Sequence, residues 1–374
     1  MQITLNTGPG NIAEIYAGAG SLNILNQWVS EKSRGFDSIF VLTDIKIRSA
    51  CLGILTSSIH ALEHAYIIEI QEGENFKSIE TAEYIWKFLA DKQASRNSLL
   101  INLGGGVITD LGGFVASTYK RGIPFVNIPT SLLGMIDASL GGKTSVNLDG
   151  IKNLIGTFQN PAAIFISAEF LKTLDNYSML SGFAEILKTA LIADLALWEE
   201  LKKMKTLDSL NLIDNKGWWE DIIFRTISIK CRIVQHDFTE KNVREILNFG
   251  HTLGHAFESL SLQKKKPLIH GHAVVLGMIC ECYLSVLKCG LDTKQRDEII
   301  NMIFSNYKYY HLNNEDVESI LKFIVNDKKR RASEIRFSLL KSPGVAISGQ
   351  SCDESEILGS INFYRSFERE GETS

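Results

Sequence analysis

Apolar and polar positions follow two different patterns along the chain. Up to residue 175, short apolar runs with the length and composition of buried strands occur at residues 38–44, 98–103, 125–129 and 163–166. Between them, apolar residues recur every three to four positions, which is typical of helices that cover a sheet. Strands that alternate with helices predict an α/β domain with a mostly parallel sheet.

From residue 177 onward the helical period dominates. Five segments repeat apolar positions at helical spacing: residues 181–203, 218–235, 244–260, 272–289 and 315–326. One further strand is predicted, at residues 335–340. We therefore expect an α/β domain over residues 1–175 and a mostly helical domain over residues 176–374.

Composition and charge limit the classes of protein to which this chain can belong. Hydrophobic residues make up 45% of the 374 positions and charged residues 22%, which is usual for a globular protein with a core. The net charge of −4 gives no reason to expect nucleic acid or an anionic membrane as partner. Residues 1–10 lack the features of a signal peptide, and no apolar run approaches the roughly 18 residues of a membrane span. The six cysteines lie mostly in apolar segments and predict free thiols in a cytoplasmic protein.

A glycine cluster follows the strand predicted at residues 98–103. Gly104, Gly105 and Gly106 lie where the strand gives way to a helix, a turn at which backbone N–H groups can approach a pyrophosphate. Asp44 ends an earlier predicted strand and could accept hydrogen bonds from a ribose. The pattern is not a strict G-x-G-x-x-G, and taken alone it indicates a plain tight turn equally well.

The most specific polar pattern consists of Arg244, Asn248, His251 and His255. Steps of four, three and four place these side chains on one face of the predicted helix. A solvated face carries Lys and Glu more often, so we favour a functional site. Two histidines four apart can share a metal, but no Glu lies between them as in H-E-x-x-H, so this pair need not be the ligand set.

Nearby residues add to this candidate site. Gly250 and Gly254 each lower helix propensity by roughly 1 kcal/mol relative to Ala, a cost that is easier to understand if something packs closely against the backbone there. His270 precedes the next predicted helix. Its neighbour His272 could be a ligand too, or a surface residue.

A pair of charges opens the helix predicted at residues 181–203. Ser181 is a plausible N-cap, and Glu185 and Lys188 share one face of the helix. The plain interpretation is a surface ion pair worth under ~1 kcal/mol. The apolar residues on both sides favour charges that point into a site. From spacing alone, the two interpretations are equally supported.

Together these segments resemble the 3-dehydroquinate synthase family of the sugar phosphate cyclases. The similarity runs from Asp44 to Leu340 in long motifs, which include GGGVITDLGGFVASTYKRG, PTSLLGMIDASLGGKTSVN, GIKNLIGTF, SGFAEILKT, REILNFGHTLGHAFE and HGHAV. The resemblance implies a Rossmann-like, NAD-binding α/β domain followed by a mostly α-helical domain that binds metal and substrate. It also implies a homodimer.

The resemblance further implies roles for single residues. The metal, Zn²⁺ or Co²⁺, would be bound by Glu185, His251 and His270. NAD would contact residues of the first domain, namely Asp44, Glu74, Lys77, Gly105, Gly106, Val107, Asp110, Thr130, Ser131, Lys143, Lys152, Phe170, Leu171, Lys172 and Thr173. The substrate would be bound by polar and charged side chains, namely Arg121 (from the second subunit of a dimer), Asp137, Lys143, Lys152, Asn153, Lys188, Lys230, Arg244, Asn248, His255 and Lys328. The catalytic set would be the proton-transfer residues Glu240 and His255 together with Lys143, Lys188, Lys230, Arg244 and Asn248.

Four positions depart from the commonest family pattern. Lys46 stands where Asn is frequent, Ser131 replaces Thr, Ala138 replaces Ser, and His272 replaces the Glu after the HG pair. None of these changes removes a group that the implied reaction needs.

The implied reaction belongs to the shikimate pathway of aromatic amino acid biosynthesis. It converts 3-deoxy-D-arabino-heptulosonate 7-phosphate, a phosphorylated seven-carbon sugar acid, to 3-dehydroquinate and phosphate. The steps are transient oxidation by NAD, β-elimination of phosphate, re-reduction and aldol closure. A substrate with about three negative charges needs several fixed cations when it is buried, which the lysines and arginine of the substrate set supply.

Three alternatives remain open. A sister cyclase that makes 2-deoxy-scyllo-inosose or a valiolone acts on a substrate without a carboxylate, so it should lack some of the substrate set. A polyol or glycerol dehydrogenase would produce net NADH. A non-catalytic descendant would be expected to have lost metal ligands, whereas all three are present in the sequence.

Overall fold

The computed structural model describes residues 1–6, 12–31, 35–149, 151–204, 206–207, 215–331 and 335–368. The side chains of residues 12, 58, 60 and 325–331 are outside the described set, and Lys328 is among them. The chain forms two compact units, one of Met1–Met179 with Leu212–Thr239 and one of Leu180–Asn211 with Glu240–Ser374. The domain bounds 1–175 and 176–374 stay a prediction.

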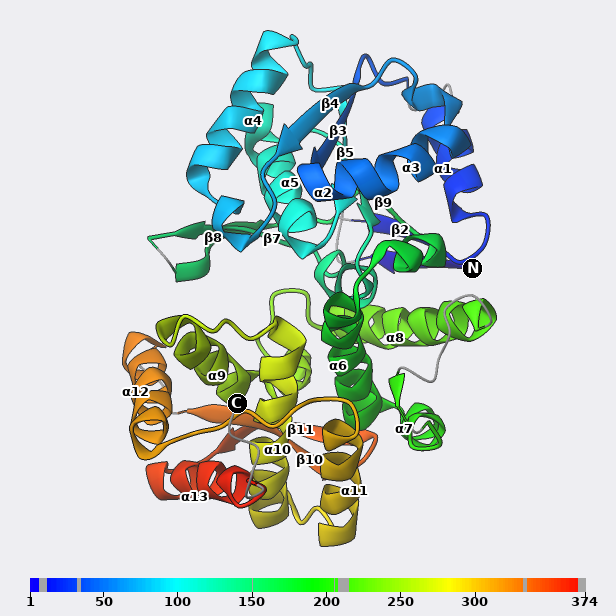
Figure 1. Ribbon diagram of the computed structural model, residues 1–374. Coiled ribbons are helices and arrows are strands. Elements are labelled where there is room, and N and C mark those ends of the chain that lie inside the picture. Colours follow the sequence, from blue (N-terminus) through cyan, green and yellow to red (C-terminus); the bar gives the residue numbers. More distant parts are fainter. Residues whose placement is uncertain are drawn as a thin grey trace. The chain divides into compact units, whose positions relative to one another are not determined.

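A seven-stranded sheet in the order β1-β2-β9-β6-β5-β3-β4 is the centre of the first unit (Figure 1). Its strands are β1 Gln2–Asn6, β2 Ile12–Ala17, β3 Ile39–Asp44, β4 Tyr66–Ile70, β5 Leu99–Gly104, β6 Phe125–Pro129 and β9 Ala163–Ile166. All neighbouring strands pair in parallel except β1 with β2. Every residue of β5 is buried, as in a strand covered on both faces. The predicted parallel α/β architecture is therefore confirmed.

Helices surround this sheet. They are α1 Ser21–Ser30, α2 Ile45–Ile47, α3 Gly53–Ser58, α4 Ile79–Asp91, α5 Gly106–Thr118 and α8 Lys216–His236, with short helical turns η1 Arg48–Leu52, η2 His60–Leu62, η3 Glu74–Phe76, η4 Tyr119–Arg121, η5 Gly134–Ala138 and η6 Ala168–Thr173. An antiparallel hairpin, β7 Lys143–Leu148 with β8 Ile151–Phe158, packs on α5. A Cβ at Gly112 of α5 would lie 1.9 Å from Oδ1 of Asn102 on β5, so this helix lies unusually close to the sheet.

The second unit is mainly helical. Its elements are α6 Asn176–Ala193, α7 Leu195–Leu201, η8 Val243–Asn248, α9 His251–Gln263, α10 His270–Cys289, α11 Thr293–Phe304, α12 Asn314–Arg331, the antiparallel strands β10 Arg336–Ser342 and β11 Val345–Ser351, and α13 Glu354–Arg365. Helix α10 packs against α9, α11, α13 and β10. By length and hydropathy alone α10 could cross a membrane, but 67% of its most apolar window is buried. It is the core helix of this unit.

Two predicted helices of this unit have different limits in the structure. The segment 181–203 forms two helices, because Asp194 ends α6 and caps α7 by accepting the N–H of Leu197 at 2.9 Å. Since α6 already begins at Asn176, Ser181 is inside the helix and is not its N-cap. The segment 244–260 is also interrupted, because Gly250 has a φ of +80° and separates the 3₁₀ turn η8 from α9.

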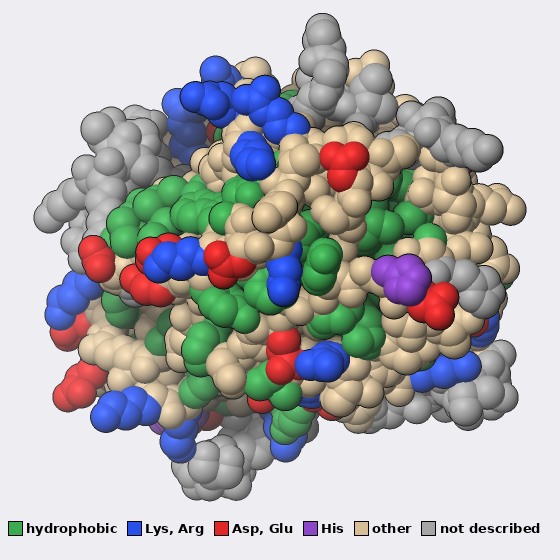
Figure 2. All heavy atoms as spheres, turned by 90° about the horizontal axis from the view of Figure 1, so that it is seen from above, with side chains coloured by type: hydrophobic (Ala, Val, Ile, Leu, Met, Phe, Trp, Pro, Cys, Tyr) green, Lys and Arg blue, Asp and Glu red, His purple; other side chains and the backbone are tan. Residues whose placement is uncertain are grey.

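The face of the molecule in Figure 2 carries charges of both signs, interspersed with hydrophobic side chains. This distribution agrees with the small net charge of −4. Such a mixed surface gives no indication of a polyanion as partner.

Candidate functional site

Three side chains of the second unit converge on one point. Glu185 of α6, His251 of α9 and His270 of α10 can each offer one ligand atom, and these atoms lie within 4.8 Å of one another. Oε1 of Glu185 lies 3.5 Å from Nε2 of His251 and also 3.5 Å from Nε2 of His270. One carboxylate and two imidazoles are a donor set of catalytic Zn²⁺ sites, in which a further coordination position stays open for a substrate.

Helices α9 and α10 touch through their backbones. A Cβ at Gly277 would lie 2.0 Å from the carbonyl oxygen of Gly250, and one at Gly254 would lie 3.1 Å from that of Ala273. The sequence-based inference that Gly250 and Gly254 allow a close approach is therefore confirmed. This contact keeps the first residues of the two helices together.

The start of α10 also packs against α6. A Cβ at Gly271 would lie 2.4 Å from the carbonyl oxygen of Ser181, and the N–H of Gly271 donates to Oγ of Ser181 at 3.2 Å. Ser181 thus connects two of the ligand helices, a role that its predicted place at a helix end did not suggest. These contacts explain why His270 reaches Glu185.

The carboxylate of Glu185 forms a buried ion pair with Lys188. The two side chains are 1% and 2% exposed, so the surface ion pair considered from the sequence is wrong. Burial raises the pKa of Glu185, but the charge of Lys188 and the neighbouring His270 outweigh burial and hold this pKa well below its usual value. Apart from the ion pair with Lys188, the oxygens of Glu185 have no hydrogen-bond partner among the described residues. An ionised carboxylate with unused lone pairs fits a divalent cation.

The two histidines of the cluster differ in their surroundings. Burial and then the charge of Lys188 lower the pKa of His251 to about 3, so this imidazole is neutral, as a metal ligand must be. Its Nδ1 lies 3.2 Å from the carbonyl oxygen of Phe249. With the proton on Nδ1, Nε2 is free to bind a metal.

His270 has an acid on each side. Burial lowers its pKa, but Glu185 and Glu258 outweigh burial and raise it to about 9. Its Nδ1 lies 3.9 Å from Oε2 of Glu258, so a carboxylate faces the ring nitrogen that metal-bound histidines commonly direct to an acceptor. A cation bound to Nε2 would displace the proton that these acids favour.

His272 lies outside this cluster. Its Nε2 is 2.7 Å from the carbonyl oxygen of Lys308, and its ring packs near that of Tyr307. Of the two histidines that the sequence left as candidates, the structure brings only His270 to Glu185. His255, on α9, is exposed, and its ring centroid lies 5.5 Å from that of His251.

The other polar residues predicted near this site lie on η8 or just before it. Arg244 and Asn248 are part of η8 and do not share a continuous helix with His251, so the prediction of a single helical face is wrong. Arg244 is 2% exposed. Nδ2 of Asn248 donates to Oε1 of Glu240 at 3.0 Å. Glu240 has a φ of +56°, which is unusual for a residue other than glycine.

In the first unit, the glycine cluster lies at a reversal of strand order. The chain runs from β3 to β4 on one side and then to β5 on the other side of β3. The carboxyl ends of β3 and β5 carry Asp44 and Gly104. In open α/β sheets, ligands bind in the crevice outside the carboxyl ends of strands at such a point. Helix α5 begins at Gly106, so its first N–H groups also face this edge.

Several groups at this edge have room or hydrogen-bonding capacity for a ligand. The hydroxyls of Thr43 and Thr130 are buried without a hydrogen-bond partner among the described residues. A Cβ at Gly105 would lie 3.2 Å from Oγ of Ser131, so glycine keeps the backbone accessible here. Asp44 caps α2 by accepting the N–H of Ile47 at 2.8 Å, and burial raises its pKa. These residues fit a dinucleotide.

A polar network joins residues predicted for NAD with one predicted for the substrate. Nζ of Lys77 lies 2.5 Å from Oδ2 of Asp110 and 2.6 Å from Oδ1 of Asn153. Oγ of Ser145 donates to the same two side chains, at 3.2 and 2.8 Å. Burial raises the pKa of Asp110, although Lys77 opposes this effect. Ser145 was not predicted, although it lies two residues after Lys143 in the quoted motif PTSLLGMIDASLGGKTSVN and so on the same face of β7.

The hairpin makes a second connection to this network. Nδ2 of Asn147 donates to Oε1 of Glu74 at 2.9 Å, and its Oδ1 accepts the N–H of Asn153 at 2.9 Å. Asn153 has a φ of +55°. Asn147 was not predicted either, because an Asn in a strand indicates no contact by itself.

The remaining predicted residues of the first unit divide into buried and exposed groups. Nζ of Lys230 on α8 donates to Oδ1 and to the carbonyl oxygen of Asp137, at 2.5 and 2.6 Å. The other cations are exposed, namely Arg121, Lys143 and Lys152. The last predicted cofactor residues, Phe170, Leu171, Lys172 and Thr173, form η6. Val107 is in the first turn of α5.

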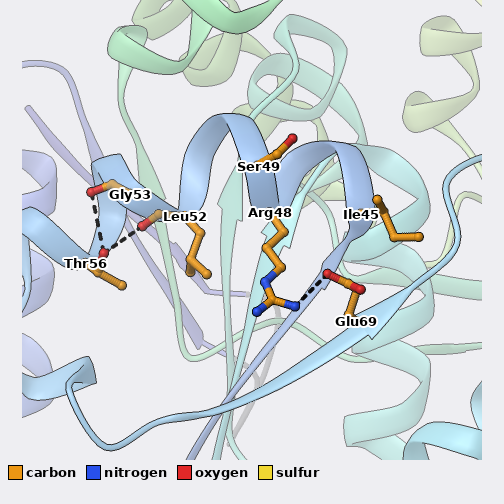
Figure 3. A pocket seen from close by; sticks show the side chains of 7 residues that line it. All are labelled: Ile45, Arg48, Ser49, Leu52, Gly53, Thr56 and Glu69. Atoms are coloured by element: carbon orange, nitrogen blue, oxygen red, sulfur yellow. Dashed lines mark hydrogen bonds and ion pairs between the residues drawn. The ribbon is translucent and has the colours of Figure 1, made fainter.

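A separate hollow of about 510 Å³ lies beside the segment formed by α2, η1 and α3, where Arg48 points toward Glu69 of β4 (Figure 3). It is lined by Ile45, Arg48, Ser49, Leu52, Gly53, Thr56 and Glu69. Nη1 of Arg48 and Oε2 of Glu69 form an ion pair of 2.9 Å in it. None of its lining residues belongs to the predicted site, and we assign it no role.

Comparison with known proteins agrees with this geometry. The family model "3-dehydroquinate synthase N-terminal" matches residues 67–181, and "3-dehydroquinate synthase C-terminal" matches residues 182–330. The 3-dehydroquinate synthase of Parabacteroides distasonis is 39% identical over 330 residues, which are 88% of this chain and 92% of that protein.

Two solved structures are similar in fold. The first is a 2-deoxy-scyllo-inosose synthase complexed with carbaglucose-6-phosphate, NAD⁺ and Co²⁺, with a TM-score of 0.82, 21% identity, and coverage of 98% of this chain and 99% of that one. The second is the 2-epi-5-epi-valiolone synthase ValA of Streptomyces hygroscopicus subsp. jinggangensis 5008 with NAD⁺ and Zn²⁺, with a TM-score of 0.78, 25% identity, and coverage of 88% and 91%. Since the two family models together span residues 67–330, more than half of the sequence, the chain belongs to the 3-dehydroquinate synthase family.

Proposed function

We propose that this chain is a phosphate-eliminating carbon–oxygen lyase that converts 3-deoxy-D-arabino-heptulosonate 7-phosphate to 3-dehydroquinate. The observation that carries the proposal is the convergence of Glu185, His251 and His270 within 4.8 Å, in a chain that is 39% identical to a 3-dehydroquinate synthase. A family member that had lost its activity would not be expected to keep this donor set intact.

We propose NAD together with Zn²⁺ or Co²⁺ as cofactors. When bound, NAD supplies a reversible hydride acceptor, and the metal supplies a Lewis acid that acidifies a substrate hydroxyl. The two similar solved structures contain NAD⁺ with Co²⁺ or Zn²⁺. Glu185, His251 and His270 would bind the metal. Residues at the carboxyl ends of β3, β5 and β6, with the Glu74–Lys77 turn and η6, would bind NAD.

The substrate would be held by cations that the chain buries. Lys188 and Arg244 are each 2% exposed, and Lys230 is 7% exposed. Lys188 pairs with Glu185 and Lys230 with Asp137, so these positive charges are held inside the protein, and a substrate with a carboxylate and a phosphate offers two further anionic groups to them. The exposed Arg121, Lys143 and Lys152 would add to this set, with Asp137, Asn153, Asn248 and Lys328 as further contacts.

Proton transfer would be performed by Glu240 and His255. The amide of Asn248 donates to Oε1 of Glu240, which orients this carboxylate and keeps one oxygen lone pair occupied. The carboxylate would hold or release a proton at its other oxygen. We also propose that the enzyme acts as a homodimer in the cytoplasm, in keeping with the free thiols of all six cysteines.

The decisive experiment measures two products at once. The protein, with Zn²⁺ or Co²⁺ and a limiting amount of NAD, is given the seven-carbon sugar acid phosphate. We expect inorganic phosphate to be released over many turnovers without accumulation of NADH, because the hydride returns to the substrate. Stoichiometric NADH, or no phosphate release, would contradict the proposal.

Three comparison substrates separate the alternatives. Glucose 6-phosphate and sedoheptulose 7-phosphate lack the carboxylate and test the two sister cyclases, and glycerol tests the dehydrogenase. If either sugar phosphate releases phosphate faster than the seven-carbon sugar acid phosphate does, the chain has the activity of a sister cyclase. Steady NADH formation with glycerol would indicate a dehydrogenase.

A further inference from the structure

A second buried acid of this unit has no place in the proposed reaction. Glu281 lies in the middle of α10 with no exposed surface. Its Oε2 accepts the N–H of Gly250 at 2.6 Å, and its Oε1 accepts the N–H of Leu253 at 3.3 Å. Among the described residues it forms no ion pair. Burial raises its pKa to about 8, although the backbone donors oppose this effect.

A buried acid without a cation is costly, so its partners should explain why it is there. The first N–H groups of a helix have no partner within the helix, and an N-cap side chain usually accepts from one of them. Helix α9 has Gly250 as N-cap, which offers no side chain. Glu281 therefore replaces the missing cap from the neighbouring helix, where the partial positive charge of the α9 N-terminus also favours an acid.

Of the two residues between these donors, His251 is the one that belongs to the metal site. His251 follows Gly250 directly and is the first residue of α9. The carbonyl oxygen facing its Nδ1 belongs to Phe249, on the other side of the same glycine. The bond from Gly250 to Glu281 thus restrains both the backbone that carries this imidazole and the group that orients its ring.

We propose that Glu281 is a positioning residue that holds His251 at the correct distance from Glu185 and His270. The inference rests on the metal site proposed above. Because His270 begins the helix that carries Glu281, the carboxylate connects two ligand-bearing helices. Its loss would allow the start of α9 to shift relative to α10, which changes the spacing of the two imidazoles.

The test removes one of the two acceptor oxygens of Glu281 and measures metal binding. In Glu281→Gln, an NH₂ group replaces one oxygen, so one of the two backbone N–H groups loses its acceptor while the side-chain volume is kept. We expect a loss of Co²⁺ affinity of about tenfold or more, the range typical of groups that orient metal ligands. We also expect a changed visible absorption spectrum of bound Co²⁺. Affinity is measured by competition with a chelator.

A matched control is available one turn along the same helix. Ser285 is fully buried, and its Oγ accepts the N–H of Leu340 on β10 at 2.9 Å. Ser285→Ala removes this contact, which leads away from α9, together with the bond from Oγ to the carbonyl oxygen of Glu281 inside α10, and it leaves the carboxylate of Glu281 in place. It should lower the melting temperature of the metal-free protein and leave the Co²⁺ spectrum and affinity as in the parent.

A second variant guards against misfolding of the first. Glu281→Asp keeps both acceptor oxygens on a shorter side chain, so we expect a shifted Co²⁺ spectrum but a smaller loss of affinity. An unchanged spectrum and affinity in the folded Gln or Asp variant would overturn the inference and leave Glu281 a purely structural residue. If the parent binds Co²⁺ but forms no product, the proposed function fails while the positioning role stands.

Discussion

Oε1 of Glu185 lies 3.5 Å from Nε2 of His251, although the two residues belong to different helices, α6 and α9. The same oxygen lies 3.5 Å from Nε2 of His270 on α10. At 3.5 Å, each of the two imidazole nitrogens is too far from the carboxylate oxygen for a good hydrogen bond. They are close enough for one cation to replace the contacts with coordinate bonds.

This geometry distinguishes the histidines by experiment. His251→Ala should abolish both bound zinc and phosphate release, because it removes one of the ligands. His272→Ala should retain both, since Nε2 of His272 contacts the carbonyl oxygen of Lys308. Zinc is measured by elemental analysis of the purified variants. Retention of zinc in the first variant and its loss in the second would make the ligand assignment wrong.

Lys152 on β8 tests the anion-binding set. Lys152→Ala should raise KM for the sugar acid phosphate by about tenfold or more, with a smaller change in kcat, because it removes binding in the ground state. Lys87→Ala is the control, since Lys87 is an exposed residue of α4 paired with Glu83. Steady-state kinetics check both variants. An unchanged KM for Lys152→Ala would remove this residue from the substrate set.

Lys188 should stabilise the metal-free protein. Lys188→Met leaves Glu185 buried without its cation, and removal of one partner of a buried pair typically costs about 3–5 kcal/mol. Zn²⁺ should restore more stability to this variant than to the parent, because it supplies the missing positive charge. Lys322→Met breaks an exposed pair with Glu318, where a change below about 1 kcal/mol is expected. Urea unfolding with and without Zn²⁺ measures both, and equal effects of the two substitutions would contradict the buried pair.

Glu281 should make the stability of the metal-free protein depend on pH. Its pKa rises from an ordinary value of 4.5 to about 8 on folding. Between these values the folded chain binds a proton that the unfolded chain does not. The free energy of unfolding therefore falls as pH increases through this window, by at most about 1.4 kcal/mol per pH unit from this group.

The matching variant is again Glu281→Gln, which cannot titrate. The difference in unfolding free energy between parent and variant should decrease from pH 5 to pH 8 and level off above it. Urea unfolding at several pH values supplies this difference. Two parallel stability curves would show that Glu281 does not take up a proton on folding.

Local patterns were sufficient to predict most of the first unit. The strands at residues 125–129 and 163–166 have the predicted limits, because a continuous apolar run with breakers at both ends specifies a buried strand without reference to the rest of the chain. The glycine turn was also predictable, since a side chain there would collide with its neighbours: a Cβ at Gly104 would lie 2.5 Å from Cγ1 of Ile108. The edge strand β1 and its neighbour β2 have no such run and were not predicted, and neither was β4 at the other edge.

Tertiary contacts decided the features that were missed. Nothing local interrupts the apolar period of residues 244–260 strongly enough to predict the break at Gly250, because the acid that stabilises this break is Glu281 on another helix. Likewise Ser181 has the composition of a cap, and its contact with Gly271 becomes visible only when α6 and α10 are side by side. A lone Glu in the apolar run MICECY was the one signal that a buried partner existed.

The approach of Gly277 to Gly250 has a consequence for tolerated variation. With 2.0 Å between a would-be methyl carbon and a carbonyl oxygen, a hydrogen atom is the largest substituent that this point allows. Even alanine would push α9 and α10 apart and so increase the distance between His251 and His270, which these helices carry. Gly277, which is not a ligand, thus limits the spacing of the proposed metal ligands.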